Sequence, residues 1–306
     1  MANVYKPEGI MLDGSLVPGI FALKEAMEQK KILEARVKLC DSAHNLILDL
    51  DSCRGIIPRS EAAIGIDDGT TRDIAIISRV NKPVCFTVTE IKTDSNGVAL
   101  AILSRKKAQE ECQAQYIDKL KLGDVIDARV THLESFGCFV DIGCGISSLI
   151  PIDAISVSRI SHPKDRFRTG QDIKAVVKMI GEDSRVTLSH KELLGTWEEN
   201  AMNFEAGETV AGIIRSVEQY GIFVELAPNL AGLAEPREGA RPGQHASVYI
   251  KSLLPDKMKI KLIIVDAFDA SYSPPKPVYY IKSGHIDLWR YSPESSERFI
   301  GTDFNA

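Results

Sequence analysis

Ser135-Phe136-Gly137-Cys138-Phe139-Val140 and Gln219-Tyr220-Gly221-Ile222-Phe223-Val224 are two segments that share the order aromatic, Gly, any residue, Phe, Val. Each segment follows a stretch in which Gly and an acidic residue precede alternating apolar positions, starting at Gly123 and at Gly207. Alternation with a period of two is typical of β-strands. Three further blocks recur behind both segments in the same order, so the chain contains a repeated β-rich module.

A third, weaker copy of the module lies upstream. Strands are predicted at 32–37, 45–50, 84–88 and 98–104, and Gly55-Ile56-Ile57-Pro58 matches the block Ser148-Leu149-Ile150-Pro151. Each copy has about seventy residues and five short strands, a size that suits one small barrel. The predicted fold is therefore mainly β, with three tandem five-stranded barrels joined by short helices and followed by a hairpin extension.

The connectors and the C-terminal extension carry their own signals. Residues 18–30, 105–120 and 190–204 have the composition or apolar spacing of helices, either as surface linkers or packed against a module. Residues 278–281 and 285–291 predict a hairpin packed on the third module, and the last residues are expected to fray or to lie along the surface. The predicted segments are 1–30 (N-terminal segment and helix), 31–104 (degenerate barrel), 105–120 (helix), 121–189 (barrel), 190–206 (helix), 207–266 (barrel with a shortened loop) and 267–306 (extension).

Composition restricts the classes of function. The 306 residues carry a net charge of −5, which argues against a protein that coats duplex nucleic acid by bulk charge. The six cysteines form no C-x-x-C pair, so neither zinc ligation nor a disulfide framework is expected. No signal peptide and no stretch long enough to span a membrane is expected, and reduced cysteines fit a cytoplasmic protein.

The paired rings indicate a surface on which unpaired bases stack. A bulge at Gly137 would bring Phe136 and Phe139 to one outer face, where each stacked base contributes about 1–3 kcal/mol. The alternative is that both rings fill the barrel core. Recurrence of the pair as Tyr220 and Phe223 favours exposure, because a tyrosine hydroxyl tolerates water better than a core.

Basic residues surround the ring-bearing strand of the second module. Such residues can contact phosphates, and the alternative is a solvated loop, since acidic residues interrupt the run. Arg185 and Lys259 stand at matching positions before the last strands of the second and third modules. The other basic candidates are Arg159, Lys164, Arg166, Arg168 and Lys174.

Together these blocks resemble the S1 RNA-binding module, an oligonucleotide-binding barrel, over roughly residues 30–266, and the arrangement is similar to the short S1-like proteins of clostridial bacteria. The resemblance implies that Phe136, Phe139, Tyr220 and Phe223 stack on RNA and that Arg185 and Lys259 hold the basic position. The family's RNA-binding histidine is replaced by Pro151 and Glu235, and its aspartate position falls at Gly181 and Pro255.

In the first module the resemblance places the aromatic sites at His44 and Ile47. That departure implies at most a docking role for this module, with the small ribosomal subunit as its partner.

Three hypotheses follow for the whole chain. The first is a single-stranded RNA-binding protein of translation or the ribosome, and the second is a protein-interaction scaffold in which the rings are core. Exposure of the four rings separates these two. An enzyme is not expected, because no metal-binding carboxylate cluster, phosphate loop or nucleophile motif is present, and Asp67-Asp68 beside Gly69 indicates a polar loop. No cofactor, metal or small-molecule substrate is expected.

Overall fold

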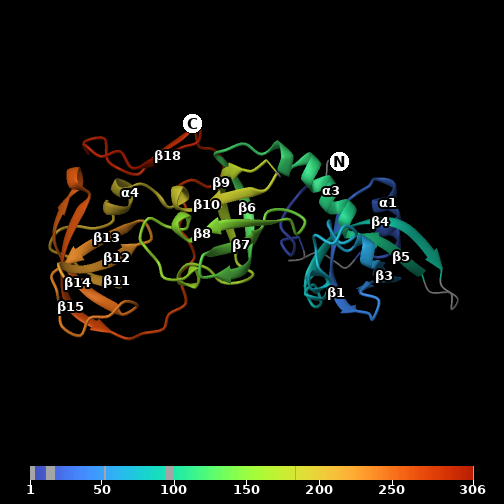
Figure 1. Ribbon diagram of the computed structural model, residues 1–306, viewed down its shortest axis with the longest axis horizontal. Coiled ribbons are helices and arrows are strands. Elements are labelled where there is room, and N and C mark those ends of the chain that lie inside the picture. Colours follow the sequence, from blue (N-terminus) through green and yellow to red (C-terminus); the bar gives the residue numbers. More distant parts are fainter. Residues whose placement is uncertain (1–3, 12–17, 52, 94–98, 183, 306) are drawn as a thin grey trace. The chain divides into compact units, whose positions relative to one another are not determined.

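The computed structural model describes residues 4–11, 18–51, 53–93, 99–182 and 184–305. Within these residues, buried side chains alternate with more exposed ones along short strands, and the strands form three five-stranded β-barrels (Figure 1). In the strand β6, for example, Ile126, Ala128 and Val130 point inward and their neighbours point outward. Each barrel has its strands in the order first, second, third, fifth, fourth, and the fourth closes on the first. The predicted fold class is confirmed.

The barrels are built from consecutive stretches of the chain. Barrel one contains β1 (Leu33–Cys40), β2 (Leu46–Leu50), β3 (Cys53–Ile57), β4 (Pro83–Thr93) and β5 (Ala99–Ser104). Barrel two contains β6 (Asp124–Glu134), β7 (Gly137–Asp141), β8 (Ser147–Pro151), β9 (Asp172–Ile180) and β10 (Val186–Ser189). Barrel three contains β11 (Thr209–Glu218), β12 (Gly221–Ala227), β13 (Leu230–Ala234), β14 (His245–Leu254) and β15 (Lys259–Phe268). Val98, predicted to begin the last strand of the first module, lies outside the described residues.

The chain forms two compact units. One comprises residues 1–120 together with 127–129 and 141–147, and the other comprises 121–126, 130–140 and 148–306. In the first unit a buried ion pair joins the N-terminal segment to a connector helix. Glu8 accepts hydrogen bonds from the Nε and Nη2 atoms of Arg105 at 2.7 and 3.0 Å, and from the backbone N–H of Cys85 at 3.1 Å.

Short helices connect the strands, and the one predicted over 190–204 is divided. In the first unit lie α1 (Ile20–Glu28), η1 (Arg59–Glu61), α2 (Asp73–Ile77), α3 (Arg105–Gln115) and η2 (Ile117–Lys119). The divided connector contains η5 (Lys191–Leu194) and α4 (Trp197–Ala201). It breaks at Gly195, whose φ of 85° leaves the helical region, and Thr196 begins α4 with a capping box to Glu199. The remaining short helices are η3 (Ile152–Ala154), η4 (Pro163–Asp165) and η6 (Pro255–Lys257).

The C-terminal extension contains a hairpin, but this hairpin does not join the predicted segments 278–281 and 285–291. β16 (Gly284–His285) pairs with β6 of barrel two, whereas β17 (Leu288–Arg290) pairs with β18 (Gly301–Asp303). The eleven-residue β6 is longer than the five-residue β7, so the start of β6 offers backbone groups that β16 takes up.

Of the two alternatives for the last residues, fraying is wrong for the described segment that ends with β18 and Phe304. The side chains of Trp289, Tyr291 and Phe304 are buried in one apolar cluster with core residues of barrel three, such as Val224. Burial of three large rings offsets the entropy cost of ordering this segment. None of the helices within the described residues has the length and apolarity needed to span a lipid bilayer.

Candidate nucleic-acid interface

The two ring pairs lie at the same place in barrels two and three and have the same geometry. Phe136 and Tyr220 sit in the hairpin turns before β7 and β12, with 55% and 68% of their surfaces exposed. Phe139 and Phe223 follow on the strands and are half-buried. The centroids of each pair are 6.0 Å and 6.2 Å apart, and both pairs meet edge to face at 88°. Neither pair fills a core.

A glycine follows the first ring because the neighbouring strand approaches too closely for a side chain. A Cβ atom on Gly137 would lie 2.6 Å from the carbonyl oxygen of Ile150, and one on Gly221 would lie 2.6 Å from that of Ala234. The bulge at Gly137 stays a prediction. In barrel three the equivalent Gly221 pairs in register with Glu218, and the register shifts between Ile214 and Ser216 instead. In both barrels the first ring of the pair precedes the strand that carries the second ring.

Strand pairing extends each ring face sideways. In barrel three Phe223 lies opposite Leu233, which in turn lies opposite Lys261 on β15. Barrel two has the matching neighbours Leu149 and Thr187 opposite each other on β8 and β10. A half-buried ring, an aliphatic side chain and a polar side chain therefore form a row across three strands. We call each row with its ring pair a ring face.

Barrel one has an aliphatic row in the corresponding place. Ile47 lies opposite Ile56, which lies opposite Ile102, and Ile47 is buried. His44 stands in the turn before β2, with its Nδ1 atom 3.3 Å from Asp73. In place of an edge-to-face ring pair, this face has aliphatic side chains and the half-buried imidazole of His44.

Two predicted basic residues accompany the ring faces. Lys259 is exposed at the start of β15, two residues before Lys261, and alternation puts both side chains on one face of the strand. Arg185 is exposed immediately before β10, two residues before Thr187. The sequence pattern predicted the aromatic and terminal basic positions as candidates. It did not indicate Leu149, Leu233 and Lys261, whose place beside the rings depends on strand register.

The predicted basic residues in and after the loop of barrel two differ in their exposure to solvent. Arg159, Lys164 and Arg168 are exposed and Lys174 is half-buried, but Arg166 is only 8% exposed. The Nη2 atom of Arg166 lies 2.5 Å from a carboxylate oxygen of Glu225 in barrel three.

This ion pair belongs to a wider network between the two barrels. Arg215 contacts Glu225 at 2.7 Å and Asp165 at 3.2 Å. Because its charge is committed to this network, Arg166 is withdrawn from the candidate RNA-binding residues. No local pattern indicates this partner, because Glu225 is 59 residues away from Arg166.

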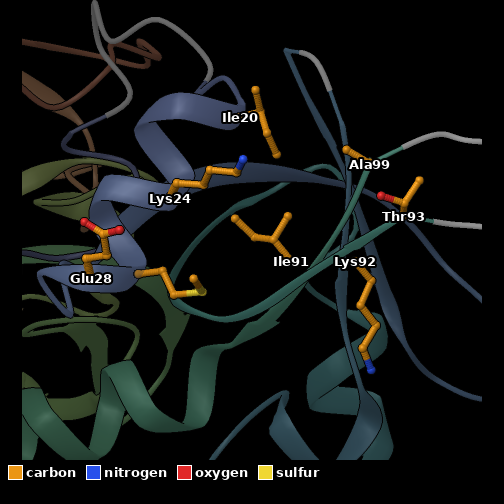
Figure 2. A pocket seen from close by; sticks show the side chains of 8 residues that line it. Ile20, Lys24, Glu28, Ile91, Lys92, Thr93 and Ala99 are labelled. Atoms are coloured by element: carbon orange, nitrogen blue, oxygen red, sulfur yellow. The ribbon is translucent and has the colours of Figure 1, made fainter.

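The first unit carries a hollow of a different kind. Figure 2 shows it between α1 and the ends of β4 and β5, where Ile20, Ile91 and Lys92 lie among its walls. Its volume is about 340 Å³, and the side chains that line it are aliphatic, polar or charged. It offers no aromatic surface for stacking.

Comparison with known proteins agrees with this geometry. Residues 119–191 match the S1 RNA binding domain family. The chain is 31% identical over 259 residues to the small ribosomal subunit protein bS1 of Staphylococcus aureus (strain COL), covering 79% of this chain and 63% of that protein. It is 30% identical over 258 residues to the bS1 homolog of Bacillus subtilis (strain 168), covering 78% and 64%. The chain thus spans less than two thirds of the length of these relatives.

Among solved structures, a multidomain protein with nucleic acid binding domains from Streptococcus pneumoniae matches over 77% of this chain and 73% of that one. The sequence identity is 13% and the TM-score is 0.26.

Proposed function

We propose, on the premise that this chain is an S1-domain protein similar to bacterial bS1, that it binds single-stranded RNA through the ring faces of barrels two and three. The observation that carries the proposal is the twofold occurrence of an exposed edge-to-face ring pair, Phe136 with Phe139 and Tyr220 with Phe223. A protein scaffold with the rings in its cores would bury them, and here they are accessible.

Stacking and local charge can act together on an acidic protein. Each stacked base contributes about 1–3 kcal/mol, and unpaired bases present the flat surfaces that a duplex hides. Arg185 and Lys259 stand next to the ring faces and are suited to phosphate contacts. The exposed Arg159 and Lys164 add positive charge from the loop of barrel two. Because few cations take part, we expect a shallow dependence of affinity on salt.

The test compares ring variants by their affinity for a labelled single strand and for a duplex of the same sequence. We expect Phe139→Ala to weaken single-strand binding about five- to hundredfold, the equivalent of one stacked base, without lowering the melting temperature. Phe21→Ala is the matched control, because Phe21 is an exposed ring on α1 of the first unit. Equal affinity of the unaltered protein for both nucleic acids, or none for either, would refute the proposal.

The role in translation and its partner are further parts of this proposal. The relatives are named as proteins of the small ribosomal subunit, and we infer a cytoplasmic binding protein rather than an enzyme. Barrel one, with the aliphatic row Ile47, Ile56 and Ile102, is assigned a docking role on that subunit. Cosedimentation with small subunits should persist when Phe139 and Phe223 are both changed to Ala, and its loss in that variant would contradict docking through barrel one.

A further inference from the structure

A second group of exposed rings lies in barrel three, outside the ring face. His245 is the first residue of β14, Phe268 is the last residue of β15, and Tyr272 follows shortly behind. The imidazole of His245 lies nearly parallel to the Phe268 ring, with centroids 6.2 Å apart and planes at 24°. Tyr272 meets the imidazole edge to face at 4.9 Å. Phe268 is 44% exposed and Tyr272 is 70% exposed.

This ring group is separate from the ring pair of the same barrel. His245 lies opposite Ile213 on β11, and Ile213 lies opposite Glu225 on β12, two positions beyond Phe223. Two strand spacings of about 4.8 Å and two residues of about 3.3 Å give roughly 12 Å between the backbones of His245 and Phe223. Phe268 lies opposite His245, one strand farther away. One base cannot stack on both groups, whereas neighbouring nucleotides of one strand can.

A cation predicted from the sequence stands beside this second group. The Nη2 atom of Arg168 donates to the carbonyl oxygen of Pro274 at 3.3 Å, two residues beyond Tyr272, and the side chain remains exposed. The nearby carboxylate of Asp269 is paired with Arg241 at 2.9 Å, which reduces its repulsion of an anion.

The segment that carries Tyr272 is held in place. Behind Pro274, the backbone N–H of Lys174 donates to the hydroxyl of Tyr279 at 3.0 Å. This bond, the bond from Arg168 to Pro274 and the edge-to-face contact of Tyr272 with His245 restrict the segment, which lowers the ordering cost of binding.

We propose that His245, Phe268 and Tyr272 form a second stacking site for an unpaired nucleobase of the same RNA strand, with Arg168 contacting a phosphate. The flat exposed rings fit a base, and the adjacent guanidinium fits the anionic backbone. This inference rests on the proposed RNA-binding function. It extends that function from two ring faces to a longer path along barrel three.

The test uses the full chain with a long single-stranded RNA of roughly 24 nucleotides, which exceeds the 4–16 that one such barrel holds and can occupy the second site together with the ring faces. We expect Tyr272→Ala to weaken binding of this long strand about five- to hundredfold. Tyr272→Trp should retain the affinity, because the ring alone is needed, and Arg168→Ala should reduce the salt dependence for the long strand.

Crosslinking gives a direct readout. A long strand containing 5-iodouridine should crosslink on irradiation to the peptide that contains Tyr272. If Tyr272→Ala binds the long strand as the unaltered protein does while Phe139→Ala binds it weakly, the second site is refuted and the proposed function stands. If Phe139→Ala also binds normally, the proposed function itself fails.

Discussion

Acidification from pH 7 to pH 5 should destabilise the unit that contains barrels two and three through one buried histidine. His190 is 1% exposed, and its Nδ1 atom lies 3.0 Å from the carbonyl oxygen of Ile155. Its Nε2 atom lies 3.1 Å from the hydroxyl of Tyr279, which already accepts the backbone N–H of Lys174. Every donor meets an acceptor when the imidazole is neutral with its proton on Nδ1 and Tyr279 donates to Nε2.

Burial lowers the pKa of His190 from 6.5 to about 4, helped by the nearby Arg166 cation and opposed by the bond to Ile155. His190 in the unfolded chain therefore binds a proton below pH 6.5, whereas His190 in the folded chain stays neutral down to about pH 4. The contribution of neutral His190 to the free energy of unfolding is fully present above pH 6.5, and it is lost as the pH falls from 6.5 to about 4. The loss is about 2 kcal/mol at pH 5 and about 3 kcal/mol below pH 4, since each pKa unit corresponds to 1.36 kcal/mol.

The assay is urea unfolding at pH 7 and pH 5, for the unaltered protein and for His190→Asn. Asn keeps a donor close to the position of Nδ1 but does not titrate, so the variant should lack this part of the pH dependence. Other carboxylates and histidines contribute equally to both proteins and cancel in the comparison. Equal losses of unfolding free energy in the two proteins, or an NMR titration of His190 with a pKa near 6.5, would refute the reasoning.

Three further variants test the packing of each unit. Glu8→Ala leaves the buried Arg105 guanidinium without its carboxylate, so the free energy of unfolding in urea should fall by about 3–5 kcal/mol while RNA affinity is retained. An unchanged free energy of unfolding would show that the ion pair does not stabilise the first unit. Asn229→Ala removes a side chain that accepts from the N–H of Val157 and donates to two carbonyl groups, so calorimetry should show a loss of about 3 kcal/mol. Tyr291→Phe deletes only the 2.7 Å bond to the Asn229 carbonyl and should cost about 1 kcal/mol, and a loss as large as that of Asn229→Ala would contradict this ranking.

Much of the fold was predictable because strand periodicity and turn residues act locally. The five strands of each barrel follow from alternating apolar positions, and the recurrence of Gly137 and Gly221 marked equivalent hairpins. The C-terminal extension was predicted less well. Its hairpin joins β17 to β18 across an intervening loop, and β16 pairs with a strand about 160 residues earlier, so no short-range pattern could indicate either partner.

The candidate site, like the fold, was predictable only in part. The residues with the chemistry for stacking could be identified from the order of amino acids, because a repeated ring pair such as Phe136 and Phe139 is visible there. Which charges remain available depends on the folded chain, since Arg166 and Arg168 look alike in sequence. One is buried against Glu225, and the other is exposed beside the Tyr272 segment. Side-chain chemistry is a local property, whereas burial and pairing depend on residues that only folding brings together.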